Sequence, residues 1–170
     1  MSLQRVLNVL FALAVVALIL TTAVVAGVVS PAAFMGTPQS YEHAEVTITN
    51  DCGRVLGTVD VRIADTYQKK VVGLSATESL STGSGMLFTY DEASKHTYVM
   101  RKMDYPLDIV FIGADGRINS IQSAPAPAPD ENGENIRRTG HGKYVLEVPR
   151  GWMQSNEIHA GDHIHINRSG

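Results

Sequence analysis

The chain has 170 residues, 44% of them hydrophobic, and a formal net charge of −3 at pH 7, which allows one ordinary domain plus an appendage. It carries no basic stripe and no ladder of alternating aromatic and basic residues, so nucleic acid is not expected as a partner. Cys52 is the only cysteine, which excludes an intrachain disulfide and a cysteine-rich metal site.

Residues 6–29 form an apolar segment without a single charge. As a helix, this segment is long enough to cross the hydrocarbon core of a membrane, so it predicts a transmembrane anchor. Val24 and Ala26 resemble the small residues that precede a cleavage site, which leaves a signal peptide open as the alternative. The predicted location is the cell membrane, or secretion if the segment is cleaved.

Charge asymmetry around this segment sets its expected orientation. Arg5 is the only charge before it, and no lysine or arginine follows until Arg54. Positive charge stays on the cytoplasmic side, so residues 1–5 are expected in the cytoplasm. Small, polar and proline residues then predict a tether over 30–44. An extracytoplasmic domain is expected to span 45–170.

The pattern of this domain predicts a mainly β fold of about seven short strands with two short helices. Alternating β-branched runs favour strands, and no long helices alternate with them, so a compact closed or half-closed barrel is expected. Strands are expected at 45–50, 54–65, 85–90, 96–101, 107–112, 117–124, 144–148 and 163–167, with short helices after Thr66 and at 151–158.

Smaller features of the chain complete the predicted domain. Asp65 or Thr66 can cap the first helix, and Val71, Val72 and Leu74 are expected on its inward face. The pair Asp115-Gly116 predicts a type I′ hairpin turn. The segment 124–143 begins with alternating alanine and proline, and it predicts a long irregular arm.

One residue stands out in the strand predicted at 107–112. Both faces of this strand are apolar, yet it contains Asp108, and a carboxylate is rarely buried unless it is paired. Asp108 is therefore expected to act as a strut that accepts the amides of an adjoining turn, or that pairs with Arg101 or Lys102. The alternative is a general acid or base at the floor of a cleft.

Histidines near the end of the chain form a second candidate site. His163 and His165 alternate on a predicted strand, so their rings share one face. With His159 or Asp162 they could supply three ligands to Zn²⁺, although an edge strand with polar side chains explains them equally. No other cofactor is expected. Asn167 fits a glycosylation acceptor pattern, and whether it is used stays open.

Aromatic residues suggest a saccharide site. Trp152, together with Tyr98, Tyr105 and Tyr144, could stack on a sugar ring. The alternative for Trp152 is a core anchor at the start of a short helix.

Four segments of the chain resemble one family. They are 71–80, 85–88, 98–118, and 144–152 with the later Ala-Gly-Asp at 160–162; in order, they carry Gly-Leu, Gly-Met-Leu-Phe, Pro-Leu-Asp and Leu-Glu-Val before Gly-Trp. This combination resembles the domain of unknown function 192 family, over roughly residues 46–166. The resemblance implies a compact β-rich domain, often secreted or membrane-tethered, without a settled activity.

The chain departs from the pattern of that family in two places. Family members often carry Met and Arg after Gly-Leu, where this chain has Ser75 and Thr77. They often carry Trp-Met-Lys-Asn-Thr where it has Val-Met-Arg-Lys-Met at 99–103. A ligand site that depends on these positions is expected to be altered here.

These observations favour a membrane-anchored, non-catalytic binding module for a saccharide or other small ligand. Its expected ligand-binding residues are Asp108, Arg101, Trp152, Tyr98 and Tyr105. One alternative is an envelope structural or partner-contact protein. Another is a hydrolase or metal-binding protein that uses Asp108 or the three histidines His159, His163 and His165.

Overall fold

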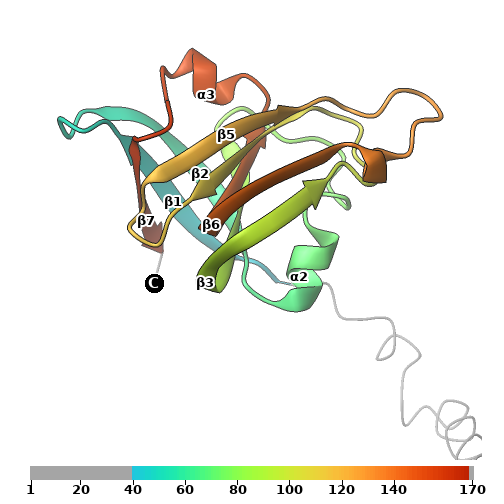
Figure 1. The fold of residues 1–170 in the computed structure, drawn as a ribbon, viewed down its shortest axis with the longest axis horizontal. Helices are drawn as coiled ribbons and strands as arrows, with labels where there is room; N and C mark the ends of the chain where they lie inside the picture. Colours follow the sequence, from blue (N-terminus) through green and yellow to red (C-terminus); the bar gives the residue numbers. More distant parts are fainter. Residues whose placement is uncertain (1–39, 169–170) are drawn as a thin grey trace, which may run out of the picture. The chain divides into compact units, whose positions relative to one another are not determined.

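The structure is a computed structural model that describes residues 40–168, shown in Figure 1. Contacts divide the chain into Met1–Ser40 and Tyr41–Gly170, and only the second unit is described below. The predicted cytoplasmic residues 1–5 and the anchor at 6–29 lie outside the described residues. Among the residues that are described, no helix has the length and apolar character needed to cross a membrane.

Seven strands and two short α-helices build the domain, in agreement with the predicted mainly β class. The strands are β1 (Glu42–Thr49), β2 (Val55–Ala64), β3 (Ser84–Val99), β4 (Leu107–Ile112), β5 (Ile118–Ala124), β6 (Arg137–Pro149) and β7 (His163–Arg168). The helices are α2 (Tyr67–Val72), α3 (Trp152–Ser155) and the 3-10 helix η2 (Gly133–Asn135). Because β1 begins at Glu42, residues 42–44 belong to the domain and not to the predicted tether.

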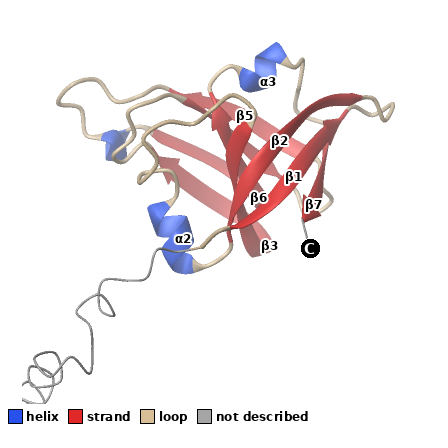
Figure 2. Cartoon of the chain, turned by 180° about the vertical axis from the view of Figure 1, so that it is seen from behind, coloured by secondary structure: helices blue, strands red, loops and turns tan. Residues whose placement is uncertain are grey.

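All seven strands form one curled sheet in the order β5-β4-β6-β3-β2-β1-β7. Neighbours are antiparallel except β2 and β3, which are parallel. The two ends of the sheet meet only at one isolated bridge, between Arg117 and His163. A single bridge does not close a ladder, so the closed form of the predicted barrel is wrong: the sheet curls but is not closed (Figures 1 and 2).

Helix α2 lies in the crossover from β2 to β3, and Figures 1 and 2 place it at the end of the sheet opposite to α3. Its predicted cap is confirmed, since the Thr66 hydroxyl accepts a hydrogen bond from the Lys69 amide at 3.3 Å. The predicted inward face is wrong for Val71 and Val72. Both are exposed, and α2 contains no buried residue.

Two hydrophobic clusters pack on the two faces of the sheet. Strand β4 contributes to both by alternation: Val110 and Ile112 belong to the first cluster, and Ile109 and Phe111 to the second. All six residues of β4 are consequently buried, as its two apolar faces predicted. The first cluster also contains Val46, Ile48, Val61, Leu146, Val148 and Trp152; the second also contains Leu74, Met86, Phe88, Met103, Leu107 and Val145.

Strands β3 and β6 are longer than the sequence predicted. The strands expected at 85–90 and 96–101 are one strand, and residues 137–143 of the expected arm belong to β6. These outer parts pair with each other through polar residues, for example by a 2.9 Å hydrogen bond between the Thr97 and Thr139 hydroxyls. Since both faces there are polar or half-exposed, no hydrophobic alternation marks them in the sequence.

The turn between β4 and β5 differs from the predicted type I′. The Gly116 amide donates to the Gly113 carbonyl at 3.2 Å, and Gly116 has φ +81° while Asp115 does not have positive φ. A type I′ turn requires positive φ at both central residues. The loop is instead a tight turn followed by a left-handed glycine, which is the three-residue type of hairpin.

Candidate functional site

Asp108 on β4 is buried, with 2% of its surface exposed, and its carboxylate is fully engaged. One oxygen accepts from the Ser123 hydroxyl at 2.6 Å. The other accepts from the backbone amides of Gly151 at 2.8 Å and Met153 at 3.4 Å. These amides begin α3, so Asp108 joins this turn to the sheet, which is the geometry expected of a strut. Arg101 is not among its partners.

A second buried carboxyl, Glu147 on β6, has no such partners. It is 5% exposed, and within residues 40–168 its side chain forms no hydrogen bond and no ion pair. It faces the second core cluster, opposite Met86 of β3 and Ile109 of β4. Burial raises the pKa of Glu147 from 4.5 to about 8, so the carboxyl retains its proton at neutral pH.

Glu147 lines a cavity of about 200 Å³ between the sheet and α2. A cavity of roughly 150 Å³ holds a ligand with a single six-membered ring, so this volume suits a small molecule. The cavity is bounded by residues from α2 and the turn after it, from β3, and from the turn that follows β3. They are Lys70, Val71, Val72, Gly73, Leu74, Ser75, Phe88, Tyr90, Thr97, Tyr98, Val99, Arg101, Met103, Leu107 and Glu147.

Two tyrosines give this cavity hydroxyl groups. The hydroxyl oxygens of Tyr90 and Tyr98 lie 2.9 Å apart, and the Tyr98 ring packs edge-to-face on Phe88 at 5.0 Å. Burial raises the pKa of Tyr98 well above 10 and also raises that of Tyr90. Both phenols are therefore neutral donors and acceptors at ordinary pH, and neither acts as a base.

Cationic groups lie where α2 and β3 border the cavity. Lys70 Nζ lies 4.4 Å from the centre of the Tyr90 ring, a cation–π contact. Arg101 donates from Nη2 to the Val71 carbonyl at 2.8 Å, and its Nη1 lies 3.4 Å from a Glu134 oxygen. These contacts hold the guanidinium beside α2.

The structure brings together only part of the residues predicted to bind a ligand. Arg101 and Tyr98 both line the Glu147 cavity, whereas Asp108 lines a separate cleft of about 420 Å³ with Ser123 and Gly151. Trp152 is 8% exposed and belongs to the first core cluster, as the core-anchor alternative predicted. It therefore does not form a common stacking surface with Tyr98.

Tyr105 packs against the second core cluster without lining the cavity. Its hydroxyl oxygen is buried and has no hydrogen-bond partner within residues 40–168. Burial raises the pKa of this phenol.

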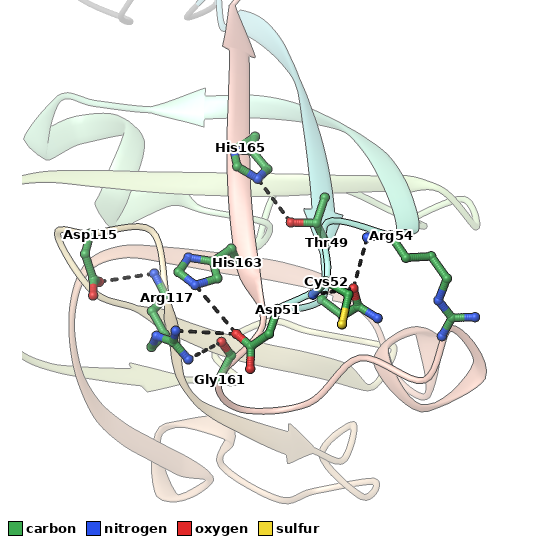
Figure 3. Close-up of polar contacts among 10 residues, drawn as sticks. Thr49, Asp51, Cys52, Arg54, Asp115, Arg117, Gly161, His163 and His165 are labelled. Carbon is green, nitrogen blue, oxygen red and sulfur yellow. Dashed lines mark hydrogen bonds and ion pairs between the residues drawn. The ribbon is translucent and has the colours of Figure 1, made fainter.

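Of the predicted metal residues, His163 forms the bridge that links the two ends of the sheet, and Figure 3 shows it with His165 on the same strand. His163 and His165 share one face of β7 as expected, but His165 bonds the Thr49 hydroxyl at 3.1 Å while His163 Nε2 lies 3.9 Å from Asp51. The amide of His159 donates to the Asp162 carboxylate. Across residues 40–168, no group of three His, Cys, Asp or Glu side chains is placed to hold a metal ion.

Asp51 acts in this region as a clasp between the ends of the sheet. Its carboxylate lies 3.4 Å from Arg117 Nη2 as well as near His163. Arg117 Nη1 also donates to the Gly161 carbonyl at 2.7 Å (Figure 3). The turn that holds Asp51, the start of β5 and β7 are thus tied together by exposed polar contacts.

Sequence reasoning missed Glu147, Lys70 and Tyr90. The sequence did contain a signal for Glu147, because this carboxylate stands inside the apolar run 144–148 just as Asp108 stands inside its own strand. Lys70 and Tyr90 carry no comparable signal, since only the crossover through α2 places them beside Glu147.

Four of the positions that depart from the family pattern line this cavity, whereas Thr77 and Lys102 do not. Ser75, Val99, Arg101 and Met103 all line it. The chain therefore presents its own set of side chains to whatever occupies the cavity.

Comparison with known proteins agrees with this fold. A family model described as DUF192, Uncharacterized ACR, matches residues 47–166, so the chain belongs to that family. No curated protein matches the chain.

Two crystal structures are similar to it. One is a "putative transcription regulator" from Sinorhizobium meliloti 1021, with a TM-score of 0.67 and 25% identity over 76% of this chain and 98% of that one. The other is a protein of unknown function from Novosphingobium aromaticivorans DSM 12444, with a TM-score of 0.63 and 29% identity over 76% of this chain and 89% of that one. Because nearly all of the Sinorhizobium chain matches, a chain with little more than the shared domain folds.

Proposed function

We propose that the described domain is a non-catalytic binding module for a small polar ligand of the saccharide class, held in the cavity above Glu147. The observation that carries this proposal is Glu147 at the cavity wall: the residue is 5% exposed, and its carboxyl has no hydrogen-bond partner among the described residues. A buried polar group without a partner is costly, so a residue of this kind is expected where a ligand supplies the missing hydrogen bond.

The lining of the cavity matches a saccharide in chemical character. Phe88, Tyr90 and Tyr98 offer aromatic surface for the apolar face of a sugar ring. The Glu147 carboxyl and the tyrosine hydroxyls offer donors and acceptors for sugar hydroxyls. A few polar groups within an apolar lining are typical of small-ligand sites.

The same features favour binding over catalysis. Glu147 is the one carboxyl that lines the cavity, and it has no second acid or base at hydrogen-bond distance among the described residues. The other buried carboxyl, Asp108, is committed to three donors on the opposite face. General acid–base hydrolysis of a glycoside uses two carboxyl groups on one substrate.

We also propose that segment 6–29 holds this module at the outer face of the cell membrane. Its support is the uncharged length of the segment and the single Arg5 before it. Membrane fractionation of the full chain, with and without external protease, tests this. Recovery of residues 40–170 in the protected fraction would contradict the orientation.

Thermal melting of the fragment 40–170 against a panel of monosaccharides tests the binding function. A ligand at a hundred times its Kd adds about 2.7 kcal/mol, which corresponds to roughly 3–5 °C for a domain of this size. Ser75→Trp, which fills the cavity from its half-exposed edge, is expected to abolish the shift. Ser81→Trp makes the same change at an exposed position outside the cavity and is expected to preserve it.

A shift that survives Ser75→Trp would place the ligand elsewhere. A flat response to the whole panel would contradict the saccharide module and would favour the partner-contact role.

A further inference from the structure

The charges that line the Glu147 cavity are unevenly distributed. Lys70 and Arg101 are its cationic residues, and Glu147 is its acidic residue. Because Glu147 retains its proton at neutral pH, the lining carries two positive charges and no negative one. A cavity with this charge attracts anions and disfavours amines.

We propose that the ligand of this cavity carries a carboxylate and belongs to the sugar-acid class, with its carboxylate held by Lys70 and Arg101 and its hydroxyls directed at Glu147. This inference rests on the proposed function, because it specifies the ligand of the same site.

Arg101 is arranged to accept such a ligand. A guanidinium has five N–H donors, and the described contacts use one for the Val71 carbonyl and one for Glu134. The remaining donors are available to a carboxylate, for which arginine is the preferred partner. The contact with Glu134 is an ion pair whose two side chains are 44% and 41% exposed. Such a pair is weak, so it opposes the transfer of Arg101 from Glu134 to a ligand carboxylate only weakly.

Lys70 provides the second positive charge from a different element. It stands in the last turn of α2, and its ammonium group is held over the Tyr90 ring. A carboxylate that bridges Lys70 and Arg101 would join α2 to the turn after β3. The charge–charge attraction is stronger here than in bulk water, because the cavity is partly screened from solvent.

At the other wall, Glu147 and the tyrosine pair supply hydrogen bonds for the hydroxyls of the ligand. One of the two hydroxyls of Tyr90 and Tyr98 donates to the other, which leaves the second proton free for a ligand. The protonated Glu147 can donate one hydrogen bond and accept others.

The titratable groups around Glu147 predict how the affinity changes with pH. They are Tyr90 and Tyr98 from β3, Tyr105 from the loop before β4, Lys70 from α2 and Arg101 from the turn after β3. Burial raises the pKa of each of these tyrosines above 10, so Glu147 is the group of this set whose resolved pKa lies between pH 7 and 9. Its ionisation places a negative charge beside the anion, and affinity is expected to fall above pH 8.

The inference is tested with three sugars that share the same ring but differ in charge: glucuronate is an anion, glucose is neutral and glucosamine is a cation. Each is titrated calorimetrically into the fragment 40–170 at pH 6.5. We expect glucuronate to bind at least about tenfold more tightly than glucose, since a charge-assisted contact contributes roughly 1.5–3 kcal/mol. The double variant Lys70→Ala, Arg101→Ala should reduce glucuronate affinity to that of glucose. The control Lys95→Ala, Lys143→Ala removes the same net charge outside the cavity and should retain the preference.

Glu147→Gln keeps a neutral hydrogen-bonding group, so glucuronate affinity should then no longer fall between pH 7 and 9. Tighter binding of glucose or glucosamine than of glucuronate overturns the sugar-acid inference and leaves the binding module intact. An equal loss of preference in the control pair also overturns it, because the attraction would then be a general surface effect. Absence of binding by all three sugars overturns both the inference and the proposed function.

Discussion

Asp108 and Glu147 lie on the neighbouring strands β4 and β6, one residue out of register, and they face opposite sides of the sheet. Asp108 is paired with Val148, and Glu147 with Ile109. Asp108 is 2% exposed and Glu147 is 5% exposed, yet the carboxyl of Asp108 has three hydrogen-bond donors and that of Glu147 has none among the described residues. The first is a structural link, and the second is the wall of a cavity.

Glu147 makes the stability of the domain depend on pH. Its pKa in the folded protein is about 8, above its ordinary value of 4.5, so between these values the folded state holds a proton that the unfolded chain has lost. Its contribution to stability is fully present below pH 4.5 and is lost as the pH rises through 8. We expect Glu147→Gln to raise the free energy of unfolding at pH 8 by as much as about 5 kcal/mol.

Urea denaturation of both proteins at pH 5 and pH 8 measures this effect. The difference between wild type and Glu147→Gln isolates the Glu147 titration from the other carboxyls. Equal differences at the two pH values would show that Glu147 ionises normally in the folded domain.

Substitutions of Asp108 should lower stability without altering the Glu147 cavity. An asparagine can still accept from the Gly151 amide and donate to the Ser123 hydroxyl, so Asp108→Asn should cost only about 1–2 kcal/mol. Asp108→Ala leaves buried donors unpaired and should cost more, about 2–4 kcal/mol. Chemical denaturation gives both values, and the reverse order would argue against the strut.

Gly140 on β6 lies directly against the ring of Phe111. A Cβ atom at this position would stand 2.3 Å from Phe111 Cγ, and Phe111 is fully buried. Gly140→Ala should therefore destabilise the domain by about 3 kcal/mol, at the upper end of overpacking effects. Gly53→Ala is the comparison, because a Cβ there meets nothing within 4 Å and only the positive φ opposes it. A larger loss of melting temperature for Gly53→Ala would contradict this ranking.

The clasp at Asp51 is expected to contribute little. The Asp51 side chain is 72% exposed, and its contacts with Arg117 and His163 are 3.4 and 3.9 Å long. Asp51→Ala should lower the free energy of unfolding by less than about 1 kcal/mol, and by still less in 1 M NaCl. Denaturation at two salt concentrations measures both quantities. A loss of several kcal/mol at high salt would mean that the clasp has a role beyond these ion pairs.

The sequence predicted the elements that combine an apolar pattern with clear ends. The strand at 107–112 was predicted with its observed bounds, and Thr66 was predicted as a cap of α2. The outer half of β6, at 137–143, has polar faces and two glycines, so its pairing with β3 left no hydrophobic pattern to read. Closure of the sheet was predicted wrongly because closure depends on how distant strands meet, which local periodicity does not encode.

The candidate site was predicted only in fragments. Arg101 and Tyr98 were named among the expected ligand-binding residues, and both line the cavity, although Arg101 does not pair with Asp108. Trp152 was grouped with them by residue type alone, and the alternation of faces in the sheet separates it from them. Glu147, the third residue of the site, was not predicted. The argument applied to Asp108, that a carboxylate within an apolar strand is rarely buried without a partner, would have identified it.

Strand order has a consequence for how the domain is made. Apart from the isolated bridge between His163 and Arg117, strand β7 pairs with β1 in the described sheet, and this pairing joins Ala44 to Arg168 across the domain sequence. Until residues 163–168 have left the ribosome, β1 keeps an open edge that carries buried-type residues such as Val46 and Ile48. The sheet can be completed only after residues 163–168 have been synthesised, because its β1–β7 pairing joins segments from the two ends of the domain sequence.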